Sequence, residues 1–366
     1  MTSDLFFKQL KQQFDRRLPF VGITQNYRLK AYLQDDDALI EVDDFKASGF
    51  VFCPFSSPDK GIIFPTSHSV CIESELKSEP ITQETYSIEE SQEAKRQHIE
   101  LVDKAIRYIR TGLAEKIVCS RKIKVPQYLQ PIDTFKKLAN CYPDAYSYCW
   151  YHPKVGLWLG ATPERFIHLD RNRLKTVALA GTLDATKSPQ PKWRAKEKQE
   201  QQMVTDFIAN ALKPYSDHVQ IQDVENVKAG NLWHLKTKIS AEIQPKNLSD
   251  VIGKLHPTSA VCGLPQAKAS SFIKNYEHYN REYYSGFLGE LNVKKQVSRR
   301  RRSLNQEQLA IKSIKTVSDL YVNLRCMKVC DEHIELFVGG GITGDSEPKA
   351  EYLETVAKSK TLLSVL

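Results

Sequence analysis

The sequence contains no run of about 18 or more consecutive apolar residues, the length that a membrane-spanning helix needs. Residues 1–17 mix acidic and basic side chains and lack the apolar core of a signal peptide. None of the eight cysteines forms a CxxC pair, which argues against a zinc site and against a disulfide framework. Internal repeats and low-complexity tracts are also absent. These absences favour a cytoplasmic protein with reduced thiols and an ordinary hydrophobic core.

The charge balance is basic. The 366 residues are 41% hydrophobic and 26% charged, which is typical of globular proteins, and the formal net charge is +8. Two interpretations are open: nucleic-acid binding through the run Arg299, Arg300, Arg301 and Arg302, or a field that attracts a small polyanionic substrate. The run has no interleaved aromatic residues and lies between two strand-like segments. We therefore interpret it as a solvated hairpin excursion whose charges keep a strand edge from pairing.

The hydrophobic pattern predicts an α+β fold. Residues 1–17 form an amphipathic helical pattern, and the polar, acidic stretch 73–93 is the best candidate for a linker or loose loop. Helical spacing over 92–113 leads into a strand over 116–125, and further helices are expected over 191–212 and around 272–276. The other strand-like segments are 50–55, 61–64, 69–72, 145–151, 155–160, 164–170, 173–179, 321–329 and 333–338. Strand pairs with helices grouped between them favour α+β over an alternating parallel sheet.

The C-terminal stretch LFVGGGITGDSEPKAEYLETVAK carries the strongest local signal for a site. Three consecutive glycines end a strand-like run and allow an approach to the backbone that a Cβ would block. In the helix that follows, Glu351, Glu354 and Lys358 fall on roughly one face. This pattern suits an anionic ligand bridged by a metal ion. The alternative is a strand, a turn and a solvated amphipathic helix.

Eight ordered blocks accompany that stretch. They are KIVCSR at 116–121, GATPERF at 160–166, ALAGT at 178–182, KQEQQMV at 198–204, LWHL at 232–235, LHPTSAVCGLP at 255–265, YNREYYSGFLG at 279–289 and LRC at 324–326. In this order the set resembles the chorismate-utilising enzymes, which include isochorismate, salicylate, anthranilate and aminodeoxychorismate synthases. The resemblance runs from about residue 100 to the C-terminus.

The resemblance implies an architecture and partners. We expect one chorismate-binding domain over 1–366, with a less typical part at 1–95 and the family core at 100–366. Its large antiparallel sheets would form an α/β sandwich flanked by helices, with the active site between the two halves. The protein would be a monomer that binds the small molecule chorismate and neither nucleic acid nor a membrane.

The resemblance also implies catalytic and metal-binding residues. Lys116 would be the base that activates water, which requires an accessible neutral amine, favoured by burial or by nearby cations such as Arg121 and Lys358. Glu164 would be the general acid, with a pKa raised by burial or by other carboxylates. Glu200 and Glu354 match the family's Mg²⁺ ligands, and Mg²⁺ prefers such oxygen donors. Glu197 and Glu351, one helical turn away, are possible additional ligands.

Further positions match substrate-binding residues of the family. Arg325 suits bidentate contact with a substrate carboxylate, and Lys358 would contact a carboxylate as well. The remaining positions supply backbone amides or line the pocket: Gly181, Thr182, His234, Thr258, Gly339 and Gly341.

Two residues discriminate among family members. Lys116 favours water over ammonia as the nucleophile, and Ala180 replaces the lysine by which aminodeoxychorismate synthases bond covalently to the ring. We therefore predict a Mg²⁺-dependent isochorismate synthase, an isomerase, with salicylate synthase as the alternative and nucleic-acid binding as a remote one. The sequence leaves open whether menaquinone or siderophore biosynthesis uses the product. Gln201 stands where a histidine often follows the metal glutamate, so the surroundings of the metal depart from the commoner pattern.

Overall fold

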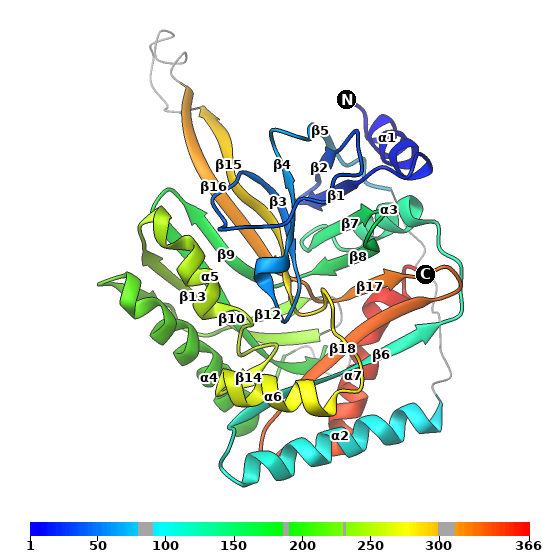
Figure 1. Cartoon of the computed structure of the whole chain (residues 1–366). Coiled ribbons are helices and arrows are strands. Elements are labelled where there is room, and N and C mark those ends of the chain that lie inside the picture. The colour runs from blue at the N-terminus through cyan, green and yellow to red at the C-terminus, as the bar shows by residue number, and fades with distance from the viewer. Residues whose placement is uncertain (80–90, 186–189, 230–231, 299–311) are drawn as a thin grey trace.

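Two large antiparallel sheets organise the chain (Figure 1). The computed structural model describes residues 1–79, 91–185, 190–229, 232–298 and 312–366. Sheet A has the spatial order β14 (Gly263–Leu264), β6 (Lys116–Val125), β18 (Ile334–Ile342), β17 (Cys326–Val329), β8 (Gly156–Thr162), β7 (Tyr146–His152), β1 (Phe20–Gln25), β2 (Arg28–Leu33) and β5 (Val70–Glu75). Sheet B has the order β11 (Val219–Ile221), β13 (Leu232–Glu242), β10 (Arg173–Asp184), β9 (Arg165–Asp170), β16 (Lys312–Val322), β15 (Phe287–Ser298), β3 (Gly49–Cys53) and β4 (Ile62–Pro65), and β12 (Glu225–Ala229) also pairs with β13.

Helices cover the outer faces of the sheets. On the side of sheet A lie α1 (Ser3–Asp15), α2 (Gln92–Arg110), α3 (Pro131–Cys141), α6 (Gln266–Tyr276) and α7 (Pro348–Leu363). On the side of sheet B lie α4 (Ala195–Leu212) and α5 (Leu248–Leu255). In Figure 1, α7 lies between β18 and α2, while α4 and α5 flank β10 and β13.

An aromatic core joins the inner faces of the two sheets. Trp150 and Trp158 of sheet A pack with Phe52 and Phe64 of sheet B, and all four side chains are fully buried. Separate apolar clusters join each sheet to its helices. The predicted α+β class and the sandwich of antiparallel sheets flanked by helices are therefore confirmed.

The chain passes from one sheet to the other at two places that matter for the site. Between β8 and β9 it crosses at Pro163 and Glu164, and between β16 and β17 it crosses at residues 323–325. The prediction of one strand over 321–329 was wrong for this reason: the segment is two strands in different sheets. Arg325, at the end of this crossing, has a φ of 47°, a left-handed conformation uncommon for arginine. The crossings place Glu164 and Arg325 where the two sheets meet.

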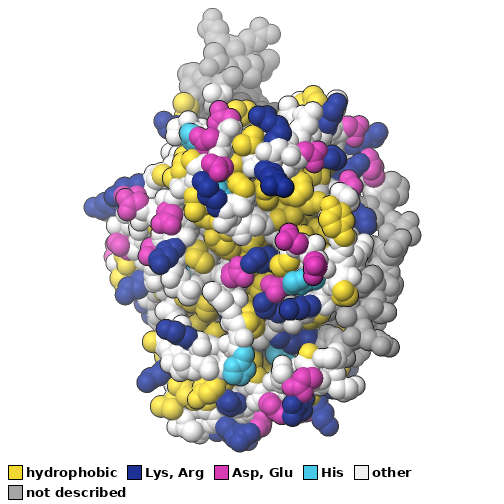
Figure 2. Space-filling model, turned by 45° about the vertical axis from the view of Figure 1, so that its right-hand side comes forward, with side chains coloured by type: hydrophobic (Ala, Val, Ile, Leu, Met, Phe, Trp, Pro, Cys, Tyr) yellow, Lys and Arg dark blue, Asp and Glu magenta, His cyan; other side chains and the backbone are white. Residues whose placement is uncertain are grey.

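Most other local predictions are confirmed, with shifted boundaries. The helix expected over 92–113 ends at Arg110, and the one expected over 191–212 starts at Ala195. The stretch 73–93, interpreted as a linker, instead gives its first residues to β5 and its last to α2, while residues 80–90 lie outside the described part. Arg299, Arg300, Arg301 and Arg302 also lie outside it. No helix among the described residues has the length and apolar character to cross a membrane. On the face in Figure 2, basic and acidic side chains are intermixed rather than gathered by sign.

Candidate active site

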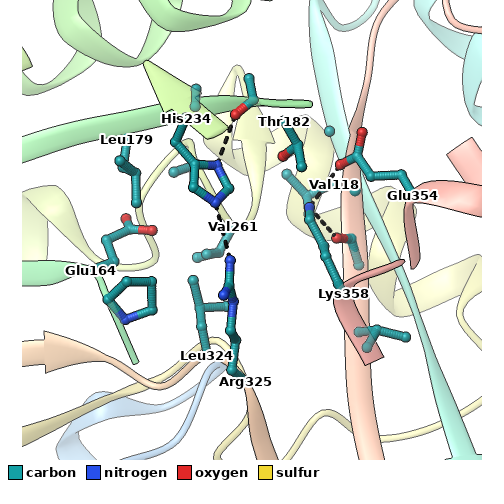
Figure 3. Close-up of a pocket in the computed structure, with 18 of the residues that line it drawn as sticks. Val118, Glu164, Leu179, Thr182, His234, Val261, Leu324, Arg325, Glu354 and Lys358 are labelled. Carbon is teal, nitrogen blue, oxygen red and sulfur yellow. Dashed lines mark hydrogen bonds and ion pairs between the residues drawn. The ribbon is translucent and has the colours of Figure 1, made fainter. Parts of the chain in front are cut away.

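A pocket of about 770 Å³, including the solvent at its mouth, opens at the junction of the two sheets. Strands β6 and β18 and helix α7 form one side, and β10, β13 and the two sheet crossings form the other (Figure 3). Its walls include these residues predicted from the sequence: Glu164, Gly181, Thr182, Glu200, His234, Arg325, Gly339, Gly341, Glu354 and Lys358. The remaining four predicted residues, Lys116, Glu197, Thr258 and Glu351, do not line it directly.

Glu164 is a buried carboxyl group at the first sheet crossing, with only 5% of its surface exposed. Burial raises the pKa of Glu164 to about 8, although Lys116, Lys358 and Arg325 oppose that rise. Its backbone N–H donates to Thr162 Oγ1, and its carbonyl accepts from the N–H of Val322 at the second crossing. A pKa raised in this way favours the protonated carboxyl group at neutral pH, which is the form that a general acid requires.

His234 and Arg325 form a second group on the opposite side of the pocket from α7 (Figure 3). His234 Nδ1 lies 2.9 Å from the carbonyl oxygen of Gly181, to which it donates, and its Nε2 accepts from Arg325 at 3.1 Å. This arrangement requires the neutral imidazole, and burial with the nearby Arg325 lowers the pKa of His234 to about 3. Gly181 lies at a break in the pairing of β10 with β13 and has a φ of 70°. The histidine thus orients the guanidinium and carries no charge itself.

Lys116 begins β6 and is completely buried. Its Nζ lies 2.9 Å from Oε1 of Glu200, which lines the pocket, but the contact is poorly aligned for a hydrogen bond, and Nζ makes none with other described residues. Burial is one of the two settings that the sequence analysis named as suitable for a base, and Lys116 is buried. The lysine lies behind Glu200, next to the glycine strand β18.

The glycines of β18 make room for these charged groups. A Cβ built on Gly341 would overlap Glu200 Oε1 and lie 2.9 Å from Lys116 Cε. A Cβ on the neighbouring Gly340 would meet Glu354 Oε1 at 3.5 Å and Glu351 Oε2 at 3.6 Å, which are ordinary contacts. A methyl group at Gly341 would therefore collide with charged side chains, whereas one at Gly340 would only contact them.

We expect Gly341→Ala to displace Glu200 and Lys116 and to lower kcat/KM by about tenfold or more, since small misplacements of reacting groups are costly. Gly253→Ala in α5 serves as the control and should leave kcat/KM within about twofold, because a Cβ at Gly253 meets nothing within 4 Å. Steady-state kinetics with chorismate, the substrate that the sequence resemblance implies, and thermal melting of both variants check this. Equal losses in the two alanine variants would contradict the steric argument.

Three carboxylates surround the glycine strand and offer oxygen ligands to a cation. Each is paired with a lysine: Glu200 with Lys116, Glu354 with Lys358 at 2.8 Å, and Glu351 with Lys196. Burial, followed by the charge of Glu354, raises the pKa of Glu351. A donor set of carboxylate oxygens beside an open backbone strand fits Mg²⁺. Among the described residues, the compact group of three potential metal ligands is instead Asp35, Asp36 and His68, outside the pocket.

Two predicted residues lie beside the pocket in other roles. Glu197 caps its own helix: its carboxylate accepts from the backbone N–H and the side chain of Arg194. These hydrogen bonds outweigh the effect of burial and lower the pKa of Glu197. Thr258 belongs to the connection before β14, where its carbonyl accepts from the N–H groups of Val261 and Cys262. Its hydroxyl is buried without a hydrogen-bond partner among the described residues.

Several wall residues were missed by the sequence analysis. Tyr284 lies within the quoted block YNREYYSGFLG but received no role, although its hydroxyl faces Gly339. The apolar walls include Val118, Leu179, Val261, Leu324 and Phe337. Nothing in a single sequence distinguishes these side chains from ordinary core residues. Lys196 was also missed, because its partner Glu351 lies on a helix distant in the sequence.

Comparison with known proteins places the chain in a family. The model of a chorismate binding enzyme matches residues 65–299, and a second model of the same description matches residues 311–364. The salicylate biosynthesis isochorismate synthase of Pseudomonas aeruginosa is 29% identical, with 75% of this chain and 56% of that protein covered. Isochorismate synthase MenF of Pasteurella multocida is 26% identical, with 72% and 60% covered. The chain therefore spans little more than half the length of these curated relatives.

A solved structure supports the fold. The 2,3-dihydroxybenzoate-specific isochorismate synthase DhbC of Bacillus anthracis matches with a TM-score of 0.76 at 20% identity, covering 98% of this chain and 99% of that one. At this identity the match concerns the fold alone. Because the first family model alone spans well over half of the sequence, this chain belongs to the chorismate binding enzyme family.

Proposed function

We propose that the chain is an isochorismate synthase that converts chorismate to isochorismate with Mg²⁺. The observation that carries the proposal is one pocket that holds the buried carboxyl group of Glu164 together with Arg325 and Lys358, beside buried Lys116. Chorismate carries two carboxylates and an allylic hydroxyl, so it needs cationic anchors, an acid and a base. The names of the Pseudomonas aeruginosa and Pasteurella multocida relatives both include this activity.

In the proposed reaction, water adds at C2 of the ring and the C4 hydroxyl leaves as water. Lys116 accepts a proton from the attacking water, and Glu164 donates a proton to the departing hydroxyl. The double bonds of the ring shift as the new C–O bond forms and the old one breaks, so the product is an isomer. Arg325, oriented by His234, holds a substrate carboxylate, and Lys358 supports a second anionic group.

Glu200 and Glu354 would hold the magnesium ion, with Glu351 beside them. When bound, Mg²⁺ would neutralise the ring carboxylate and stabilise charge as the allylic system rearranges. Glu197 remains a possible ligand only if its capping bonds to Arg194 open.

Salicylate synthase, which adds pyruvate elimination to the same pocket, is the second candidate. The name of the Pseudomonas aeruginosa relative mentions salicylate biosynthesis but describes that protein as an isochorismate synthase. This name favours formation of isochorismate without pyruvate elimination. Nucleic-acid binding is disfavoured, because it would leave the buried carboxylates and lysines of the pocket without a role.

The decisive experiment incubates the purified protein with chorismate and Mg²⁺, with and without EDTA, and separates the products by chromatography. We expect isochorismate in the presence of metal and none after chelation. Salicylate with pyruvate, above a control without enzyme, would instead assign the second candidate. Correctly folded protein without any turnover would refute both.

A further inference from the structure

Strand β6 carries Val118 to the pocket wall and Lys116 to its place behind Glu200, and one edge of this strand is only partly paired. Strand β18 follows β6 along its whole length, but β14 pairs with it only at Lys116 and Ile117. Beyond that point the N–H of Val118 still donates to the carbonyl of Cys262. The carbonyl of Val118 and the N–H of Ser120 then face an edge that no strand of the described residues covers. Buried backbone groups of this kind need partners.

A buried ion pair supplies those partners. Arg281 and Glu277 have side chains only 2% and 1% exposed. Arg281 Nη2 donates to the carbonyl of Val118 at 2.7 Å, and the backbone N–H of Ser120 donates to Glu277 Oε1 at 2.7 Å. The pair therefore continues the hydrogen-bonding pattern of sheet A where β14 stops.

The same guanidinium reaches a second wall of the pocket. Arg281 Nη1 donates to the carbonyl of Val261 at 2.8 Å, while Nε donates to Glu277 Oε2 at 2.8 Å. The side chains of Val118 and Val261 both line the pocket. Because a guanidinium is planar and its donors point in fixed directions, one residue sets the distance between these two walls.

We propose that Arg281 and Glu277 are positioning residues that fix Lys116 and the Val118 and Val261 walls relative to each other. This inference rests on the proposed function, since it concerns the placement of the proposed base. Neither residue lines the pocket, so they act through the backbone that they hold. Arg281→Lys keeps the charge but offers three donors on one nitrogen in place of the four hydrogen bonds that three guanidinium nitrogens make here.

The test compares Arg281→Lys and Glu277→Gln with a control that loses a buried ion pair elsewhere. Glu290 is such a control: it is 6% exposed, and it binds Lys30 and Lys295 at 2.7 Å each, in contacts that lie outside the pocket. We expect kcat with chorismate to fall about tenfold or more in both test variants, because displaced reacting groups slow the chemical step. In Glu290→Gln, kcat should stay within about twofold despite a comparable loss of thermal stability.

Hydrogen exchange supplies a readout that does not depend on turnover. Ser120, Glu277 and Tyr279 line a groove between α2 and β6, so water can reach this edge once the pair is broken. We expect peptides covering residues 117–122 to exchange at least about tenfold faster in Arg281→Lys and Glu277→Gln, and at the wild-type rate in Glu290→Gln. Unchanged exchange would overturn the proposal outright. Faster exchange with wild-type kcat would overturn the positioning role and leave a structural one, whereas a wild type inactive towards chorismate would refute the proposed function instead.

Discussion

Lys116→Ala is expected to lower the rate of isochorismate formation by about 10²- to 10⁴-fold, the usual contribution of a general base. Lys116 is fully buried, and its only charged contact among the described residues is Glu200 at 2.9 Å. Removing the amine therefore deletes the proposed proton acceptor and also releases a carboxylate that lines the pocket. Product formation over time, followed by chromatography, measures the first effect.

Mg²⁺ binding to the same variant separates the base from a supporting role. In Lys116→Ala, Glu200 has lost the lysine contact that competes with a metal ion, so this variant should bind Mg²⁺ at least as tightly as the wild type in calorimetric titration. Lys122→Ala is the control. Lys122 lies on the same strand and pairs with Glu335, and its alanine variant should keep wild-type turnover. Loss of both turnover and Mg²⁺ binding in Lys116→Ala would mean that the lysine serves the metal site. Turnover within a few-fold of the wild type would exclude it as the base.

Local spacing predicted part of this site correctly. The helical positions of Glu351 and Glu354 placed both on one face, and both do approach Gly340. Lys358, four residues after Glu354, pairs with it as helical neighbours do. These features depend only on the geometry of one helix, which a sequence specifies.

Features that depend on contacts between distant segments could not be predicted in this way. The apolar pattern of 321–329 is the same for one strand as for two, so it did not reveal that the chain changes sheets at Arg325. The bonds of Lys196 to Glu351 and of Arg281 to Val118 likewise join elements far apart in the sequence. The resemblance supplied ten of the residues that line the pocket, whereas the pairings of Glu200 with Lys116 and of Glu351 with Lys196 emerged only from the structure.

Glu164→Gln is expected to lower kcat by about 10²- to 10⁴-fold, because the amide fills the same space but cannot release a proton to the leaving hydroxyl. The wild-type rate should also fall as pH rises through about 8, the raised pKa of Glu164, where the acid loses its proton. In Glu164→Gln that decline should be missing from the residual activity. A wild-type rate that stays level well above pH 8 would argue against Glu164 as the acid.

Stability against pH tests the same pKa without any substrate. Burial raises the pKa of Glu164 from 4.5 to about 8, so between these values the folded protein keeps a proton that the unfolded chain has lost. The free energy of unfolding of the wild type should therefore fall, relative to Glu164→Gln, by about 1.4 kcal/mol per pH unit across that window and then level off.

Glu335→Gln is the matched control with the opposite sign: although burial opposes it, the hydrogen bond from Lys122 lowers the pKa of Glu335. The carboxylate of Glu335 should stabilise the fold at pH values above the ordinary pKa of a glutamate. This stabilisation should be lost as the pH falls through the lowered pKa. Urea unfolding from pH 3 to pH 9 covers both windows and distinguishes the two slopes. Parallel curves for wild type and Glu164→Gln would show that Glu164 is ionised at neutral pH and cannot be the acid.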